Sequence, residues 1–169
     1  MGFDFQMQNK SLDLPPDYKP LYEEMPGAYQ LSSTGVAVVG EMMFLSGVLD
    51  TITPFPDFNP PILNRLFAKV SELLRLAPAW SIDNLIERES PFEGKVPAYK
   101  FSSNDGWLVS ERECTLICNA LAENTDNNYS KLKKGKLCQK ISDQEFLTLF
   151  NEWLSYNSVA ARNGGYRVL

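Results

Sequence analysis

The residue types that carry out most enzyme chemistry are scarce in this chain. It contains no histidine, the side chain that most often serves as a general base near neutral pH and as a metal ligand. Its three cysteines are Cys114, Cys118 and Cys138. A zinc site needs four ligands and a cysteine nucleophile needs a base. We therefore predict that the cysteines are small buried side chains, and we predict no metal site, no cofactor and no catalytic residue.

Carboxylates remain as candidates for acid–base chemistry. Glu41 lies in the most apolar stretch of the sequence, where burial would raise its pKa and make it a general acid or base. Alternatively, it meets an arginine or a backbone donor, or lies at the edge of the core. Asp105 is the second candidate. A concave pocket lined by two or more acids would favour an enzyme, whereas a flat surface would exclude one.

The most distinctive motif is the segment 102–107, Ser-Ser-Asn-Asp-Gly-Trp. Asn, Asp and Gly are typical of a tight turn, with Gly106 at a positive φ. In a purely structural interpretation, Trp107 buries its ring in the core. In a functional interpretation, Asn104, Asp105 and Trp107 form the tip of a recognition loop. Exposure distinguishes them, because a buried Trp107 favours structure and an exposed one favours a contact site.

Two further candidate binding residues, Phe55 and Phe58, lie in the proline-rich connection 51–61. Loops of this kind often insert into the groove of a partner, and the alternative is that both rings fold back onto the domain. Packing of Phe55, Phe58 or Trp107 against a second copy of the chain would also allow self-association.

Length and composition are those of one globular domain over residues 1–169. The chain is 44% hydrophobic and 22% charged, which is usual for folded proteins that bury a core. Its longest apolar stretch, residues 36–49, is interrupted by polar residues and glycines. We therefore expect no membrane span. An odd number of cysteines and the lack of a signal-like N-terminus predict a cytoplasmic protein.

The first half of the chain predicts one strand and two helices. Apolar and polar residues alternate over 2–7, as in a strand with one buried face. Residues 11–26 contain four prolines and should wrap around the domain. Residues 34–49 predict a central helix, although 36–39 would also suit a short strand. A second helix should begin at Asn59 and end at Pro78.

The second half predicts a hairpin followed by two capped helices. Two apolar runs joined by Asn-Asp-Gly indicate a β-hairpin over 96–109. Ser110 with Glu113, and Ser142 with Glu145, each have the spacing of a capping box that opens a helix.

The chain end completes the predicted sheet. Asn163-Gly164-Gly165 should stop the last helix, and residues 166–169 should form a strand that pairs with the N-terminal one. The polar, lysine-rich stretch 124–136 is expected to be mobile. The predicted fold is α+β: a mostly helical single domain with a small antiparallel sheet, built from the terminal strands and the 96–109 hairpin.

Three segments also carry a resemblance: MGFDF at the start, KFSSNDGWLVSERECTLI in the middle and FNEWLSYNSVAARNGGYRVL at the end. They resemble a group of small uncharacterised bacterial proteins with an N-terminal GFDF and an internal SNDGW turn. Residues 11–26 and 124–140 lie outside the resemblance. It implies a bacterial origin and a single domain, and it implies no activity.

Charge supplies the functional hypotheses. The net charge is −5, but five lysines between Lys131 and Lys140 leave the rest of the chain with a net charge of −10. Such an acidic body attracts cationic partners and repels nucleic acid. We therefore predict a non-enzymatic protein-binding module, of the immunity or antitoxin kind, that blocks a basic partner. One alternative is a small enzyme using carboxylates such as Glu41 or Asp105. Another is that Lys131 to Lys140 contacts nucleic acid.

Overall fold

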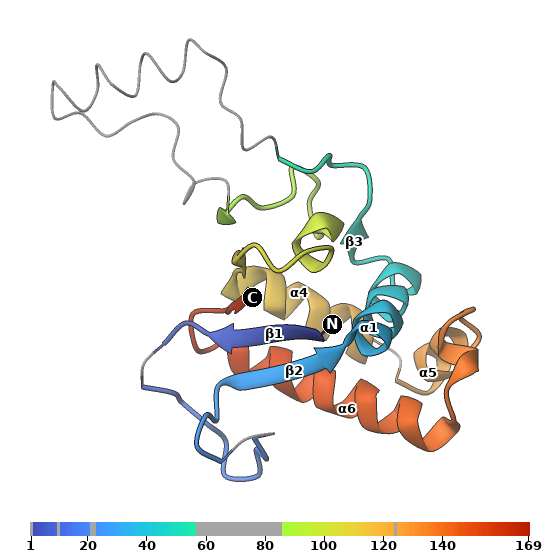
Figure 1. Cartoon of the computed structure of the whole chain (residues 1–169). Coiled ribbons are helices and arrows are strands. Elements are labelled where there is room, and N and C mark those ends of the chain that lie inside the picture. The colour runs from blue at the N-terminus through green and yellow to red at the C-terminus, as the bar shows by residue number, and fades with distance from the viewer. Residues whose placement is uncertain (1, 10, 21–22, 57–85, 124) are drawn as a thin grey trace, which may run out of the picture.

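A four-stranded antiparallel sheet joins the two ends of the chain in the computed structural model, and Figure 1 shows the N- and C-termini close to each other beside β1. The structure describes residues 2–9, 11–20, 23–56, 86–123 and 125–169. The strand order in the sheet is β2-β1-β6-β5. The strands are β1 Gly2–Met7, β2 Ala28–Ser32, β5 Trp107–Val109 and β6 Tyr166–Val168.

Alternation along the strands gives the sheet one apolar and one polar face. Phe5 of β1 lies opposite Tyr29 of β2 and Val168 of β6, and all three side chains are buried. Asp4 and Gln30, which point to the other side, are exposed. The period of two in the sequence therefore sets which residues enter the core. The predicted pairing of the N-terminal and C-terminal strands is confirmed.

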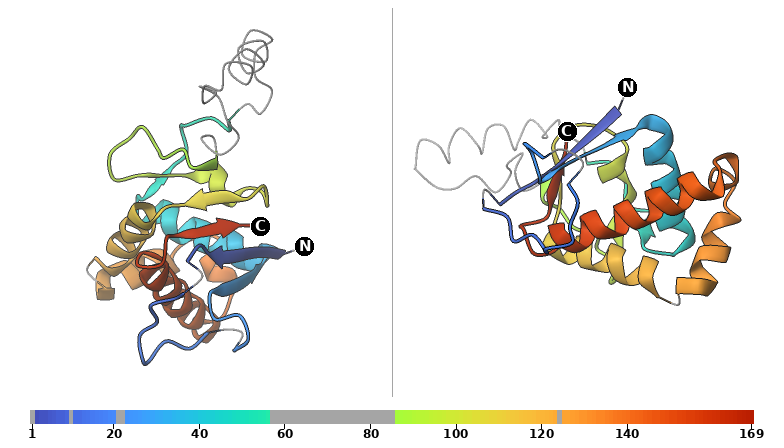
Figure 2. Two further views of the ribbon diagram at one scale, coloured as in Figure 1. Left: turned by 90° about the vertical axis from the view of Figure 1, so that its left-hand side faces the viewer. Right: turned by 90° about the horizontal axis from the view of Figure 1, so that it is seen from below.

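Helices pack on the apolar face of the sheet (Figure 2). The described α-helices are α1 Ser33–Leu45, α4 Glu111–Ala122, α5 Thr125–Lys133 and α6 Asp143–Ala160. Of these, α5 lies further out, against α1 and α4 (Figure 2). Two 3₁₀ turns are η1 Ala98–Phe101 and η2 Cys138–Lys140. The predicted α+β fold class is confirmed, and no described helix is long and apolar enough to cross a membrane.

Aromatic side chains join α6 to the sheet. The indole of Trp153 lies edge-on to the ring of Phe5, with 5.3 Å between their centroids, and 6.0 Å from the ring of Tyr166. Tyr156, one turn further along α6, stacks on Tyr29 of β2 at 5.1 Å. Edge-on and offset arrangements of this kind add to the free energy gained by burying the rings. This cluster fixes α6 against β1, β2 and β6.

Local sequence signals set the starts of α4 and α6 and the end of α6 as predicted, whereas α1 ends at Leu45 and not at the predicted residue 49, which lies in a strand. In the first capping box, the Ser110 amide donates to Glu113 Oε2 at 2.9 Å and the Glu113 amide donates to Ser110 Oγ at 3.2 Å. The Ser142 and Glu145 pair repeats the pattern. At the end of α6, the amide of Gly165, with φ +74°, donates to the Ala160 carbonyl. Both capping boxes and the glycine stop are confirmed.

The predicted hairpin over 96–109 is wrong. Val96–Pro97 forms β4, which pairs in parallel with β3, Leu49–Asp50, in a separate sheet. Trp107–Val109 pairs with β6 instead. Pro97 has no N–H to give to a ladder, and residues 98–101 coil into η1 rather than continuing as a strand. Two parts of the prediction are as expected: Gly106 has φ +79°, and residues 107–109 form a strand.

Other expectations for the middle of the chain have mixed outcomes. Residues 125–133 of the stretch expected to be mobile form α5, because Leu132 is buried and Tyr129 packs on Phe146 at 5.2 Å. Residues 36–39 are helical, so the alternative of a strand there is excluded. Strand β2 was not predicted. The helix expected from Asn59 to Pro78 lies outside the described residues.

Candidate functional site

The Ser-Asn-Asp-Gly-Trp turn is held by its own hydrogen bonds. Ser103 Oγ accepts a hydrogen bond from Trp107 Nε1 at 3.0 Å and donates to Asp105 Oδ2 at 2.6 Å. Asn104 Nδ2 donates to the Gly2 carbonyl at 3.0 Å, which ties the turn to β1. Trp107 is fully buried. By the exposure criterion, the structural interpretation is favoured, although the other two candidate residues of the turn, Asn104 and Asp105, are exposed.

Phe55 folds back onto the domain, although its side chain is partly exposed. Its ring lies edge-on to those of Tyr99 and Trp107, with centroid distances of 5.8 and 5.2 Å. It therefore covers the indole of Trp107 instead of extending into solvent. Phe58, the other aromatic candidate, lies outside the described residues.

Glu41 acts as a helix cap rather than as an acid or base. Its Oε2 accepts hydrogen bonds from the backbone amides of Leu137, at 2.7 Å, and Cys138, at 2.8 Å. Burial would raise the pKa of Glu41, but these amides hold it below its ordinary value. Of the two interpretations of Glu41, a raised pKa is therefore wrong and contact with a backbone donor is confirmed. The carboxylate instead stabilises the start of η2 from a neighbouring helix.

The thiols are unsuited to nucleophilic chemistry. Cys114 and Cys138 are buried. Burial raises the pKa of Cys118 to about 11 and that of Cys138 to about 12, and it also raises that of Cys114. Each thiol is therefore protonated at neutral pH, whereas the thiolate is the reactive form. Over the described residues, no three acids or cysteines are grouped so as to hold a metal ion.

A buried ion pair, which the sequence did not indicate, lies behind the turn. Lys100 Nζ is 2.7 Å from Glu113 Oε2 and also donates to the Leu108 carbonyl at 2.6 Å. Burial lowers the pKa of Lys100 and raises that of Glu113. The contacts join η1, β5 and the start of α4, so the role of the pair is to hold these elements together.

Asp50 is a second buried carboxylate whose oxygens are all engaged. Its Oδ1 accepts hydrogen bonds from the amides of Ile52 and Thr53, and its Oδ2 accepts one from Ser90 Oγ at 2.6 Å. The Thr53 hydroxyl also donates to Oδ2. Burial alone would raise the pKa of Asp50, but the hydrogen bonds from Ser90 and Thr53 outweigh it and lower the pKa to about 2.

We expect Asp50 to make the protein acid-sensitive in a defined pH range. Because its pKa in the folded state lies below the ordinary value of 3.8, its stabilisation is complete above that value and is lost as pH falls from about 4 to about 2. The variant Asp50→Asn should lose on the order of 1–2 kcal/mol of unfolding free energy at pH 7. Urea titrations at several pH values measure this. An equal difference between the two proteins at pH 7 and pH 2.5 would contradict the prediction.

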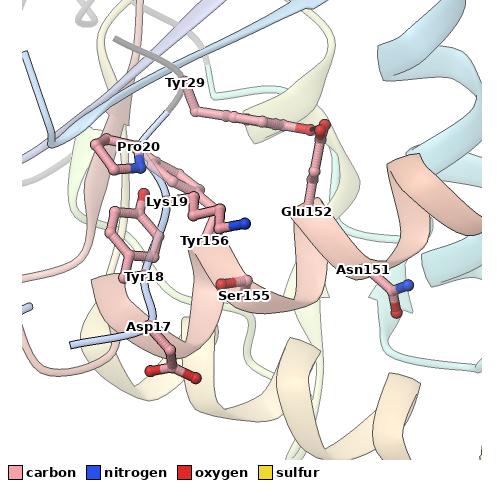
Figure 3. Close-up of a pocket in the computed structure, with 9 residues that line it drawn as sticks. All are labelled: Asp17, Tyr18, Lys19, Pro20, Tyr29, Asn151, Glu152, Ser155 and Tyr156. Atoms are coloured by element: carbon pink, nitrogen blue, oxygen red, sulfur yellow. Dashed lines mark hydrogen bonds between the residues drawn. The ribbon is translucent and has the colours of Figure 1, made fainter. Parts of the chain in front are cut away.

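The described residues do form a concave site, and it lies between the loop 17–20 and α6 (Figure 3). The cavity has a volume of about 370 Å³, within the range of ligand sites. We call it the tyrosine cleft. Its described lining residues are Asp17, Tyr18, Lys19, Pro20, Tyr29, Asn151, Glu152, Ser155 and Tyr156.

The tyrosine cleft has an aromatic wall and a charged rim. Tyr29 reaches from β2 to α6, where its hydroxyl donates to Glu152 Oε2 at 3.2 Å (Figure 3). Burial and the neighbouring Glu152 carboxylate raise the pKa of Tyr29, so that the hydroxyl remains a donor. Tyr18 lies on the loop 17–20, near Tyr156 (Figure 3). Asp17, Lys19 and Glu152 are exposed at the rim.

The loop that forms one wall of the cleft is anchored at its start. Asn163, fully buried after α6, accepts a hydrogen bond from the Asp13 amide at 2.7 Å and donates to the Asp13 carbonyl at 3.1 Å. Leu14 and Tyr18 pack against the core. The prediction that residues 11–26 wrap around the domain is confirmed for these side chains. Leu21 and Tyr22, two further side chains of this segment that the sequence offers as anchors, lie outside the described residues.

Sequence reasoning missed this cleft. Of the residues that the sequence predicts, Asn104, Asp105, Trp107 and Phe55 do not line it, and Phe58 lies outside the described residues. The lining residues come from a loop, a strand and the last helix, and no local motif connects them. Comparisons with family models, curated proteins and solved structures found no match. The resemblance to the small bacterial group stays a prediction, and the functional argument depends on the site alone.

Proposed function

We propose that this protein is a non-enzymatic binding module for a basic protein partner, of the kind that includes immunity proteins and antitoxins. The observation that carries the proposal is the excess of exposed carboxylates on the described surface. Exposed lysines gather around α5 and η2, whereas over the rest of the described surface exposed carboxylates outnumber exposed lysines and arginines. These carboxylates include Asp13, Asp17, Glu23, Glu24, Glu87, Glu93, Glu111 and Glu152.

Such a surface supports electrostatic steering. A field of one sign over most of a protein raises the association rate of an oppositely charged partner, and it suppresses association with nucleic acid. Lys133 adds little to the positive charge of the exposed lysines around α5 and η2. Its ammonium donates to the Ile141 carbonyl at 2.8 Å and pairs with Asp143 at 3.1 Å.

An enzyme that uses carboxylates is the less supported alternative. The tyrosine cleft does contain two acids, Asp17 and Glu152, which is the feature that an enzyme would need. Both are exposed, whereas enzymes obtain a general acid from a carboxyl group by placing it in an apolar environment. The two acids that the sequence suggested, Glu41 and Asp105, are engaged in hydrogen bonds elsewhere.

The proposal is tested by capture followed by measurement on purified components. The tagged protein is immobilised, exposed to a lysate of its source organism at low salt, and eluted with rising salt. A basic protein released by salt is then purified, and its association rate is measured at 50 and 300 mM salt. We expect the rate to fall about tenfold or more over this range, because screening weakens the attraction.

Two surface variants provide the control. The charge-reversal variant E23K/E24K/E87K/E93K alters exposed acids that do not line the tyrosine cleft, and it should slow association by at least about tenfold. The variant K131A/K134A/K136A should keep or increase the rate. Binding that is insensitive to salt, binding lost in the lysine variant, or no partner at all would refute the proposal.

A further inference from the structure

We propose that the tyrosine cleft binds a guanidinium group, presented as an arginine side chain of the basic partner. This inference depends on the proposed function for the source of the arginine. Its own basis is the arrangement of Glu152 and the three tyrosines, Tyr18, Tyr29 and Tyr156, around one cavity. Neither the turn at residues 102–107 nor the buried Lys100–Glu113 pair lines this cavity.

The first argument is charge. The rim carries Asp17 and Glu152 against Lys19, so the described part of the cleft has an excess of negative charge. Glu152 is held in place because Oε2 accepts the Tyr29 hydroxyl at 3.2 Å. A carboxylate has about four lone-pair sites, so Glu152 keeps most of its capacity to accept hydrogen bonds from a ligand. The cleft therefore attracts a cation and offers it an oriented acceptor.

The second argument is the aromatic wall. Tyr29 and Tyr156 are stacked on each other and are almost fully buried, so they form a rigid surface that loses little entropy on binding. The hydroxyl of Tyr156 donates to the Gly27 carbonyl at 3.2 Å, which fixes that ring further. Tyr18, on the loop 17–20, lies near Tyr156 (Figure 3) and also lines the cavity. The faces of Tyr29 and Tyr156 are covered by each other, so the half-buried ring of Tyr18 is the one whose quadrupole can stabilise a cation placed over its face.

The third argument separates arginine from lysine. The guanidinium group is planar, stacks on aromatic faces and donates to a carboxylate through two parallel N–H groups. The ammonium group of lysine is a strongly hydrated point charge that gains less from a flat wall. At about 370 Å³ the cavity exceeds what a single ammonium group would fill. Ser155 and Asn151, which also line the cavity, are residue types that can accept further hydrogen bonds.

The test uses small probes, so that it does not depend on finding a partner. N-acetyl-arginine methylamide is titrated into the ¹⁵N-labelled full chain, and amide shifts are followed. We expect saturable shifts at Tyr18, Tyr29 and Ser155 with a dissociation constant of about 1–10 mM, as befits one side chain. The uncharged isostere N-acetyl-citrulline methylamide and N-acetyl-lysine methylamide should each bind at least about fivefold more weakly.

Variants at the rim test whether the cleft binds a cation or an anion. Glu152→Gln should weaken arginine binding about tenfold, since a charged acceptor becomes neutral. Lys19→Met should tighten it by about twofold, because a like charge is removed. A cleft that binds anions would show the opposite order. Both side chains are exposed, so amide shifts away from the cleft should stay unchanged and confirm that the variants are folded.

The outcomes separate this inference from the proposed function. Absence of saturable arginine shifts, equal binding of citrulline, or weaker binding by Lys19→Met would overturn the assignment of the cleft, whether or not a partner is captured. If arginine binds as expected but the lysate yields no basic protein, the proposed function fails and the cleft remains a guanidinium site for a small ligand. If a partner binds Glu152→Gln as tightly as wild type, its arginine does not occupy the cleft.

Discussion

Replacing Lys100 with methionine should destabilise the protein more than removing any surface ion pair. Lys100 and Glu113 are both buried, and the Nζ to Oε2 distance is 2.7 Å. In Lys100→Met, Glu113 stays in the core without its cation, and its remaining donor is the Ser110 amide at 2.9 Å. Leaving one member of a buried pair uncompensated costs about 3–5 kcal/mol. Urea unfolding at pH 7 measures the loss.

The double variant Lys100→Met/Glu113→Leu isolates the cost of the unpaired charge. With both charges gone, most of the stability should return, because an apolar pair of similar volume often replaces a buried ion pair without loss. About 1 kcal/mol should remain missing, since Glu113 also completes the capping box of α4.

A matched surface control is Arg112→Ala. Arg112 pairs with Glu89 at 3.0 Å, but its side chain is 65% exposed, and exposed pairs contribute at most about 1 kcal/mol. If Lys100→Met lost no more stability than Arg112→Ala, the buried pair would have no special role.

The parts of the fold that the sequence predicted depend on neighbours in the chain. The capping boxes at Ser110 and Ser142 join residues three positions apart, and their spacing alone specifies them. The alternation of apolar and polar residues over 2–7 indicates a strand with one buried face. It predicts this strand even when the neighbouring strands are unknown. The backbone after α6 has a positive φ at two positions, and glycine is favoured there because few other residues adopt such angles.

The errors concern partners that lie far apart in the chain. Two apolar runs flanking Asn-Asp-Gly are typical of a hairpin, but β4 pairs with β3 and β5 with β6. No residue near Val96 in the sequence indicates that this strand pairs with Leu49. Lys100 was not predicted to be buried, because a lysine enters a core only when a partner such as Glu113 and a carbonyl such as that of Leu108 are already there.

The candidate site was missed for the same reason. Tyr29 and Glu152 are 123 positions apart and meet only because β2 packs on α6. In the sequence, Glu152 is one of 21 acidic residues, and Tyr18 is one of several large side chains in a proline-rich stretch. The overall excess of acid could be recognised, but the place where it faces a tyrosine wall could not.

Replacing Gly165 with alanine should cost far more than the same change at another glycine with similar backbone angles. Gly165 has φ +74°, and Gly94 has φ +70°. Both substitutions force alanine into a left-handed conformation, which costs about 1–2 kcal/mol. A Cβ on Gly94 would meet no atom within 4 Å, whereas one on Gly165 would overlap the Val109 carbonyl oxygen and approach the Ser110 carbonyl carbon to 3.0 Å.

The difference between the two variants measures how closely the end of α6 must approach β5. Backbone atoms cannot rotate away as a side chain can, so Gly165→Ala would have to shift β6 from its place between β1 and β5. We expect Gly94→Ala to lose about 1 kcal/mol and Gly165→Ala to lose at least about 3 kcal/mol, with a lower yield of folded protein. Thermal and urea unfolding of both variants test this. Equal losses would mean that β6 moves away from Val109 at little cost, and that the close packing of the chain end is not required for the sheet.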